Sequence, residues 1–65
     1  MAVKILRLPD VKFVTGQSRS TIYSKMAKGE FPASISLGAR SVGWIESEVQ
    51  DWILTQIEKS RQGNS

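Results

Sequence analysis

The side chains best suited to binding chemistry are concentrated between residues 18 and 28. This segment combines hydroxyl groups with cations: Ser18, Arg19, Ser20, Thr21, Tyr23, Ser24, Lys25 and Lys28. Hydroxyl and guanidinium groups hydrogen-bond to base edges and phosphate oxygens, and lysine ammonium groups neutralise phosphate. These residue types therefore favour recognition of a nucleic acid.

No arrangement of residues in the chain fits catalysis or metal binding. The chain has no Cys and no His, which removes thiolate nucleophiles, imidazole bases and zinc sites. A paired acid and base and a phosphate-binding glycine loop are also missing. The sequence therefore predicts a protein that is not an enzyme and that binds no metal, no cofactor and no small-molecule ligand.

Charge is unevenly distributed along the 65 residues, whose net charge is +3. Residues 1–43 hold seven basic and two acidic groups, whereas residues 44–65 hold two basic and four acidic groups. A basic surface attracts a polyanion. We therefore expect the first part of the chain to face double-stranded DNA and the last part to face away from it.

The binding residues need a helix to expose them, and residues 19–28 have the pattern of one. Ser18 is a suitable N-cap, and Gly29 suits the left-handed position that ends a helix. Ile22 and Met26 form its apolar face. The other faces are expected to present six residues to the major groove: Arg19, Ser20, Thr21, Tyr23, Ser24 and Lys28.

Two further residues of this segment, Ser18 and Lys25, are placed for contact with the phosphate backbone of DNA. The alternative for the cations is an ordinary solvated surface. The alternative for Tyr23 is a position at the edge of the core, with its hydroxyl in water.

A shorter helix is predicted over residues 9–14, followed by a tight turn that contains Gly16. Its apolar face is formed by Leu8, Val11 and Val14. Phe13 lies off that face. It is expected either to pack under the N-terminal segment or to contact a partner protein.

After Pro32 the apolar residues alternate with polar ones, which predicts a β-hairpin. They form two short runs, Ile35 with Leu37 and Val42 with Trp44, around a turn at residues 38–41. Residues 3–6 are also prone to β structure. We expect Arg40 at the tip to enter the minor groove of DNA, with Ser41 beside it.

A third helix is predicted from Ser47, which can form a capping box with Gln50. Its buried stripe is Val49, Trp52, Ile53 and Ile57, and Trp44 and Trp52 are assigned to the core. Its other side is acidic, with Glu48, Asp51 and Glu58. This helix is therefore expected to close the core, while Leu54 is either a core residue or a partner contact.

Together these elements predict a mainly α domain with a small β-hairpin, which is a winged helix-turn-helix, over residues 1–59. Residues 60–65 are polar and are expected to form a disordered C-terminal tail. No apolar run is long enough for a signal peptide or a membrane span. The expected location is cytoplasmic, at the nucleoid when bound to DNA.

Four segments occur in a fixed order along the chain. They are Leu8–Val11 (LPDV), Thr15–Tyr23 (TGQSRSTIY), Gly29–Pro32 (GEFP) and Val42–Val49 (VGWIESEV), followed by Trp52-Ile53. In this combination they closely resemble the AlpA family of small prophage regulators, which is related to phage excisionases and MerR proteins.

The resemblance implies a winged helix-turn-helix and a role in prophage or integrative-element biology. It supports Arg19, Ser20, Tyr23 and Ser24 as recognition-helix residues and Arg40 as the wing residue. Excisionase-like relatives often present more Arg on this helix, and this departure from their pattern predicts few direct guanine contacts here. The chain also lacks the long C-terminal coiled coil of MerR proteins.

Three functions follow from these observations. The first is a sequence-specific DNA-binding transcriptional regulator. The second is an architectural excisionase that bends DNA and recruits an integrase, with a dimer or cooperative array of the chain on its site. The third is a protein-interaction adaptor on the same fold, in which Phe13 and Leu54 contact a partner.

Overall fold

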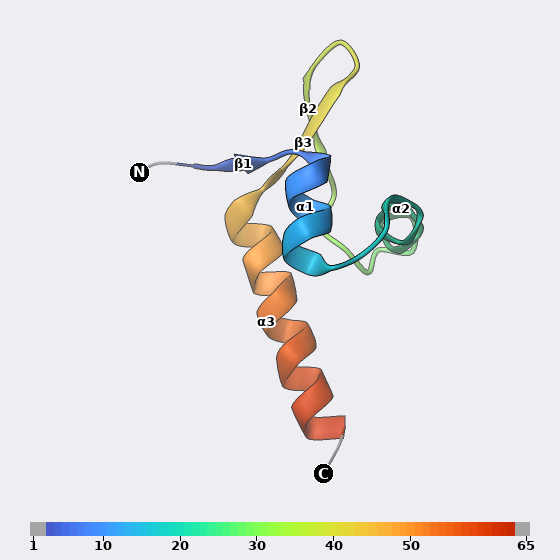
Figure 1. Ribbon diagram of the computed structural model, residues 1–65, viewed down its shortest axis with the longest axis vertical. Helices are drawn as coiled ribbons and strands as arrows, with labels where there is room; N and C mark the ends of the chain where they lie inside the picture. Colours follow the sequence, from blue (N-terminus) through green and yellow to red (C-terminus); the bar gives the residue numbers. More distant parts are fainter. Residues whose placement is uncertain (1–2, 64–65) are drawn as a thin grey trace.

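The computed structural model describes residues 3–63 and arranges three helices around a small antiparallel sheet (Figure 1). The elements in chain order are β1 (Ile5–Leu6), α1 (Leu8–Thr15), α2 (Arg19–Ala27), β2 (Ile35–Gly38), β3 (Ser41–Ile45) and α3 (Glu46–Gly63). This confirms a mainly α domain of winged helix-turn-helix type. No helix of the described chain is long and apolar enough to cross a membrane.

The sheet joins the predicted hairpin to the N-terminal segment. Its strand order is β1-β3-β2, with Leu6 opposite Trp44 in the first pair and Ile35 opposite Gly43 in the second. A Cβ atom on Gly43 would lie 2.5 Å from Cγ2 of Ile5. Glycine at this position therefore lets the β1 side chain lie directly over the central strand.

The buried core takes one side chain from each helix and from β1 and β3, and Phe31 from the segment after α2. Val11 of α1, Ile22 of α2, Trp44 of β3 and Val49 of α3 are fully buried. The indole Nε1 of Trp44 donates to the carbonyl of Pro32 at 3.1 Å, so this buried donor is satisfied. The predicted core positions of Ile22, Val49 and Trp44 are confirmed.

The predicted apolar face of α1 is wrong at Val14, which is 46% exposed. The inward side consists instead of Leu8, Val11 and Thr15, spaced by three and four residues. Their centre lies about 90° from Val14 at 100° per residue. Thr15 can take this half-buried place because its hydroxyl donates to the carbonyl of Val11 at 2.6 Å.

Helix α3 begins at Glu46, directly after β3 and two residues before the predicted first residue Glu48. Ser47 therefore lies within the first turn, and the prediction of a capping box with Gln50 is wrong. The backbone N–H of Glu46 donates to the carbonyl of Lys4 at 2.9 Å. Pairing with the N-terminal segment thus satisfies the first free N–H of the helix.

Helix α3 also extends further than predicted, to Gly63. The expected tail over 60–65 is therefore helical as far as Gly63, because residues 60–62 contain no helix-breaking Gly or Pro. Residues 64 and 65 lie outside the described part. The second half of α3 projects from the body of the domain (Figure 1).

The projection of α3 explains the exposure of two apolar side chains. Ile57 is 41% exposed, so its assignment to the buried stripe is wrong, and Leu54 is 61% exposed. Trp52 and Ile53 are half-buried and pack against the core. Only the first two turns of α3 therefore contribute strongly to the core.

Candidate nucleic-acid interface

The outer face of α2 brings most of the predicted binding residues together. Ile22 is fully buried and Met26 is half-buried beneath the helix. The exposed side surrounds a hollow of about 300 Å³, which is lined by Ser20, Thr21, Ser24, Lys25, Lys28 and Glu30. This hollow combines three hydroxyl groups and two ammonium groups, which are donors suited to phosphate oxygens and base edges.

The start of α2 is stabilised by the predicted cap. The backbone N–H of Thr21 donates to Oγ of Ser18 at 3.3 Å, and that hydroxyl donates to Oγ1 of Thr21 at 2.9 Å. The Ser18 hydroxyl is therefore occupied within the helix. Its structural role as the N-cap is confirmed.

The Arg19 guanidinium lies over the ring of Tyr23, which follows it by one helical turn. The guanidinium carbon of Arg19 lies 5.0 Å from the centre of the Tyr23 ring. That ring meets Trp44 edge-on, with 6.3 Å between centroids and an interplanar angle of 67°. Tyr23 is half-buried at the edge of the core, the alternative position considered from the sequence, while Arg19 is exposed.

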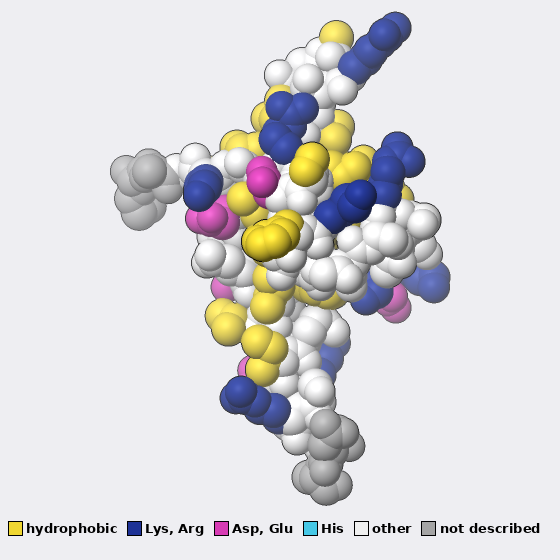
Figure 2. Space-filling model, in the orientation of Figure 1, with side chains coloured by type: hydrophobic (Ala, Val, Ile, Leu, Met, Phe, Trp, Pro, Cys, Tyr) yellow, Lys and Arg dark blue, Asp and Glu magenta, His cyan; other side chains and the backbone are white. Residues whose placement is uncertain are grey.

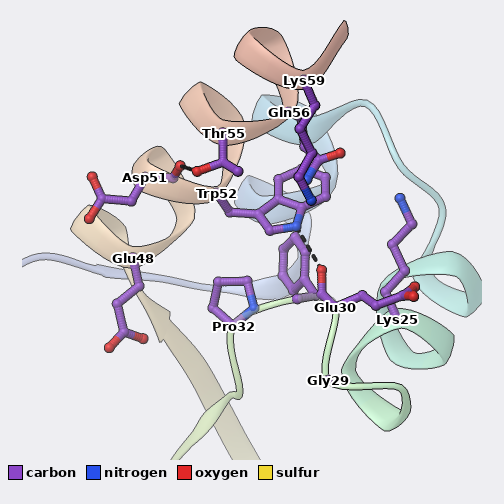
Figure 3. A pocket seen from close by; sticks show the side chains of 11 residues that line it. Lys25, Gly29, Glu30, Pro32, Glu48, Asp51, Trp52, Thr55, Gln56 and Lys59 are labelled. Carbon is purple, nitrogen blue, oxygen red and sulfur yellow. Dashed lines mark hydrogen bonds between the residues drawn. The ribbon is translucent and has the colours of Figure 1, made fainter. Parts of the chain in front are cut away.

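Lys25 borders a second depression, between α2 and α3. This groove has a volume of about 720 Å³, with Trp52 and Phe31 among its lining residues (Figure 3). The Lys25 ammonium lies 5.2 Å from the centre of the Trp52 ring. Lys25 therefore lines both the α2 hollow and the α2–α3 groove, with its ammonium over an aromatic ring of the groove.

The floor of this groove ties α3 to the segment after α2. Trp52 Nε1 donates to the carbonyl of Glu30 at 2.7 Å, and its ring packs edge-on against Phe31 at 4.8 Å (Figure 3). These contacts fix the end of α2 relative to α3. The end of α2 is thus held against α3 through the segment that follows it.

The wing is a hairpin that projects from the body, with β2 and β3 pairing from Ile35 to Ser41 (Figure 1). Arg40 lies at its tip with φ of 64°, and Ser41 is half-buried. Lys and Arg side chains occur at this tip and over α2 (Figure 2). The wing is thus a separate basic projection, and its tip stands apart from α2.

Two residues that border these surfaces were missed from the sequence. Glu30 places a carboxylate at the edge of the α2 hollow, which neither helical angles nor net charge could reveal because it lies beyond the helix end. Arg7 donates through Nε to the carbonyl of Val42 at 3.0 Å, and so links α1 to the wing. An isolated Arg before a predicted helix offers no sequence signal for this contact.

Phe13 lies outside the core. Its side chain is 87% exposed, so packing beneath the N-terminal segment is excluded. Within residues 3–63, no group of three or more Asp and Glu side chains is arranged to hold a metal ion. The exposed cations of α2 and of the hairpin tip therefore lie on the α2 hollow, the Arg19–Tyr23 pair and the wing.

Comparison with known proteins identifies the relatives of the chain. Residues 4–57 match the model of the family described as prophage CP4-57 regulatory protein (AlpA). The chain is 45% identical over 60 residues to an uncharacterised protein, ORF88, of Enterobacteria phage P4, covering 92% of this chain and 68% of that protein.

It is also 47% identical over 58 residues to the DNA-binding transcriptional activator AlpA of Escherichia coli K12, covering 80% of this chain and 83% of that protein. The family match covers every element from β1 to the first three turns of α3. The chain therefore belongs to the AlpA family of prophage regulatory proteins.

Proposed function

We propose that the protein is a sequence-specific DNA-binding transcriptional regulator of a prophage or integrative element. The observation that supports it most strongly is the exposed face of α2, where three hydroxyl groups and two lysines line one hollow together with Glu30, on a helix anchored by the buried Ile22. A helix of this size fits the major groove. The E. coli relative, named as a DNA-binding transcriptional activator, supports the same function.

In this proposal, α2 lies in the major groove and the hairpin reaches toward the minor groove. Ser20, Thr21 and Ser24 face base edges. Lys28, which the sequence assigned to the major groove, is exposed at the C-cap of α2 and in this proposal meets the phosphate backbone. Arg40 at the hairpin tip enters the minor groove, where a cation gains from the concentrated negative potential. Such a protein acts at the bacterial nucleoid.

The acidic part of the chain is consistent with this orientation. The first two turns of α3 contain three acidic residues, Glu46, Glu48 and Asp51. Lys and Arg side chains, in contrast, occur over α2 and at the wing tip (Figure 2). Because phosphate repels carboxylates, DNA is expected to meet α2 and the wing rather than α3.

The projecting wing also favours a second function, that of an architectural excision factor. A basic hairpin that enters the minor groove can stabilise bent DNA. A circular-permutation assay separates the two functions. A strong bend across several adjacent sites supports excision, whereas an unbent integrase-gene promoter supports transcriptional regulation alone.

The test of DNA recognition is a fluorescence-anisotropy titration at several salt concentrations. The probes are random duplex DNA and duplexes from the element's integrase promoter and attachment site. We expect salt-sensitive binding with at least about a hundredfold preference for one native duplex. Absence of binding at low salt would refute DNA recognition and favour the adaptor function, with Phe13 and Leu54 as partner contacts.

A further inference from the structure

Three side chains connect the core to the outer surface at the start of α2. Trp44 is fully buried, Tyr23 is half-buried against it, and Arg19 is exposed above the Tyr23 ring. The two contacts are 6.3 Å and 5.0 Å long, measured to ring centres. The guanidinium of Arg19 thus rests on an aromatic ring that the core itself supports.

The contact with the Tyr23 ring leaves the hydrogen-bonding capacity of Arg19 available. A cation over an aromatic ring is attracted by the charge distribution of the ring, so this contact uses none of the guanidinium N–H groups in a hydrogen bond. No hydrogen bond or ion pair within residues 3–63 uses the Arg19 guanidinium. Its five donors therefore remain free for a bidentate contact with guanine or a phosphate.

The same geometry argues against a direct contact between Tyr23 and DNA. Trp44 and Arg19 both lie against its ring, and its half-buried position follows from the contact with the core. A ring held in this way restricts where the Arg19 side chain can move. Restriction before binding reduces the conformational entropy that a long side chain loses when it contacts DNA.

We propose that Tyr23 is a positioning residue, which holds the Arg19 guanidinium in place for DNA by resting on Trp44, and is not itself a base-contacting residue. This inference rests on the proposed DNA-binding function. It replaces a direct role for the Tyr23 hydroxyl with a role for its ring. It also makes Arg19 the main source of guanidinium contacts on a helix that otherwise offers hydroxyl groups and lysines.

The test is a double-mutant cycle on the native duplex identified by the titration. Arg19→Ala is expected to weaken specific binding about tenfold, and Tyr23→Leu about 3- to 10-fold, which corresponds to immobilising one long side chain. In the Arg19→Ala background, Tyr23→Leu should cause no further loss. Tyr23→Phe keeps the ring and should bind within about twofold of the wild type.

The conservative variant Arg19→Lys provides a matched control for charge. Lysine keeps the positive charge but lacks the planar group that stacks and forms bidentate contacts. We expect Arg19→Lys to keep the salt dependence of binding while losing preference for the native duplex. Tyr23→Leu should have little further effect in this background as well.

Two outcomes would overturn the proposal. A loss with Tyr23→Phe equal to that with Tyr23→Leu would show that the hydroxyl contacts DNA directly. If Tyr23→Leu lowers the affinity for the native duplex equally in the presence and in the absence of Arg19, the role of Tyr23 is only structural. If Tyr23→Leu unfolds, Tyr23→Met fills similar space without a ring and replaces it in the cycle.

A measurement on the free protein separates failure of this inference from failure of the proposed function. The ring should shift the Arg19 side-chain proton resonances upfield in NMR spectra, and Tyr23→Leu should remove that shift. An unshifted Arg19 in the folded wild type refutes the positioning role. A shifted Arg19 in a protein without DNA affinity refutes the DNA-binding function and with it any use of the pair on DNA.

Discussion

At the scale of single residues, the surface of α2 is distinguished by how its cations are held. Arg19 lies on Tyr23 and Lys25 lies over Trp52, whereas Lys28 has no aromatic partner among residues 3–63. Three cations that look equivalent in the sequence therefore differ in the conformational freedom that each side chain loses when it binds DNA. The side chain already placed by a ring needs less ordering than a free one, provided that its position is the bound one.

Lys28 and Lys25 are expected to contribute unequally to DNA binding. Lys25 must leave the Trp52 ring to reach a phosphate, whereas Lys28 is exposed at the C-cap of α2. Lys28→Ala should lower the salt slope of binding by about 0.9, the value for one phosphate contact. Lys25→Ala should change it less, in titrations over the same salt range. Equal changes would contradict this ranking.

Glu30 is expected to oppose binding to DNA of any sequence. Its carboxylate borders the α2 hollow beside Lys25 and Lys28, so it repels a phosphate there. Glu30→Gln should raise affinity for random duplex DNA about 2- to 5-fold at low salt, with a smaller gain at high salt. Preference for the native duplex should fall.

Glu58→Gln is the matched control for this charge change. Glu58 is exposed on α3, outside the α2 hollow, so its removal alters the net charge by the same amount. Random-duplex affinity should change less than with Glu30→Gln. Equal gains in the two variants would show that total charge, and not the position of Glu30, controls binding.

At the scale of elements, the wing combines a binding group with a strained backbone position. Arg40 has φ of 64°, in the left-handed region that favours glycine. Retaining a side chain there has a cost in stability. The tip is therefore a place where binding and stability are expected to favour different residues.

Arg40→Gly and Arg40→Ala separate these two effects. Both remove the guanidinium and should weaken DNA binding to a similar extent. Only glycine relieves the left-handed strain, so Arg40→Gly should be more stable than Arg40→Ala by about 1 kcal/mol. Thermal melts followed by circular dichroism should show a difference of about 4–8 °C. Unchanged DNA affinity in both variants would remove the wing from the mechanism.

The elements also differ in how well local patterns predicted them. The N-cap and glycine signals at the ends of α2 are local. The N-cap Ser18 and the end of the helix just before Gly29 were therefore predicted correctly. The start of α3 was not, because its first N–H is satisfied by Lys4 from the N-terminal segment. A partner distant in sequence replaced the local cap that Ser47 offered.

At the scale of the whole molecule, stability depends on few large side chains. In the part of the chain that the structure describes, six hydrophobic side chains are buried: Leu6, Val11, Ile22, Phe31, Trp44 and Val49. Trp52 covers this cluster and links α3 to the segment after α2. A small domain has a stability of only a few kcal/mol, so loss of one such contact affects the whole fold.

Trp52→Ala is expected to destabilise the domain by about 3 kcal/mol, the lower end for loss of an aromatic side chain, because Trp52 is half-buried. Trp52→Phe keeps much of the packing against Phe31 and loses the hydrogen bond to the Glu30 carbonyl, so it should cost about 1 kcal/mol. Thermal melts compare the two. A wild-type melt for Trp52→Ala would refute this linking role.

Sequence alone determined the parts that depend on neighbours in the chain. Helix and strand periods identified the two helices before the wing, the hairpin and the apolar faces of Ile22 and Val49. The distribution of charged residues along the sequence distinguished a basic first part of the chain from an acidic last part. These predictions succeeded because caps, turns and amphipathic periods act within a few residues.

Only the tertiary structure decided which side chains meet across the fold. Trp52 lies 27 residues from Lys25, and Trp44 lies 21 residues from Tyr23, yet each pair is in contact. The packing of the elements also left Val14 and Ile57 exposed, although their spacing in the sequence had predicted burial. Helical angles show which residues share a face, but packing of one element on another decides where that face points and how far it is covered.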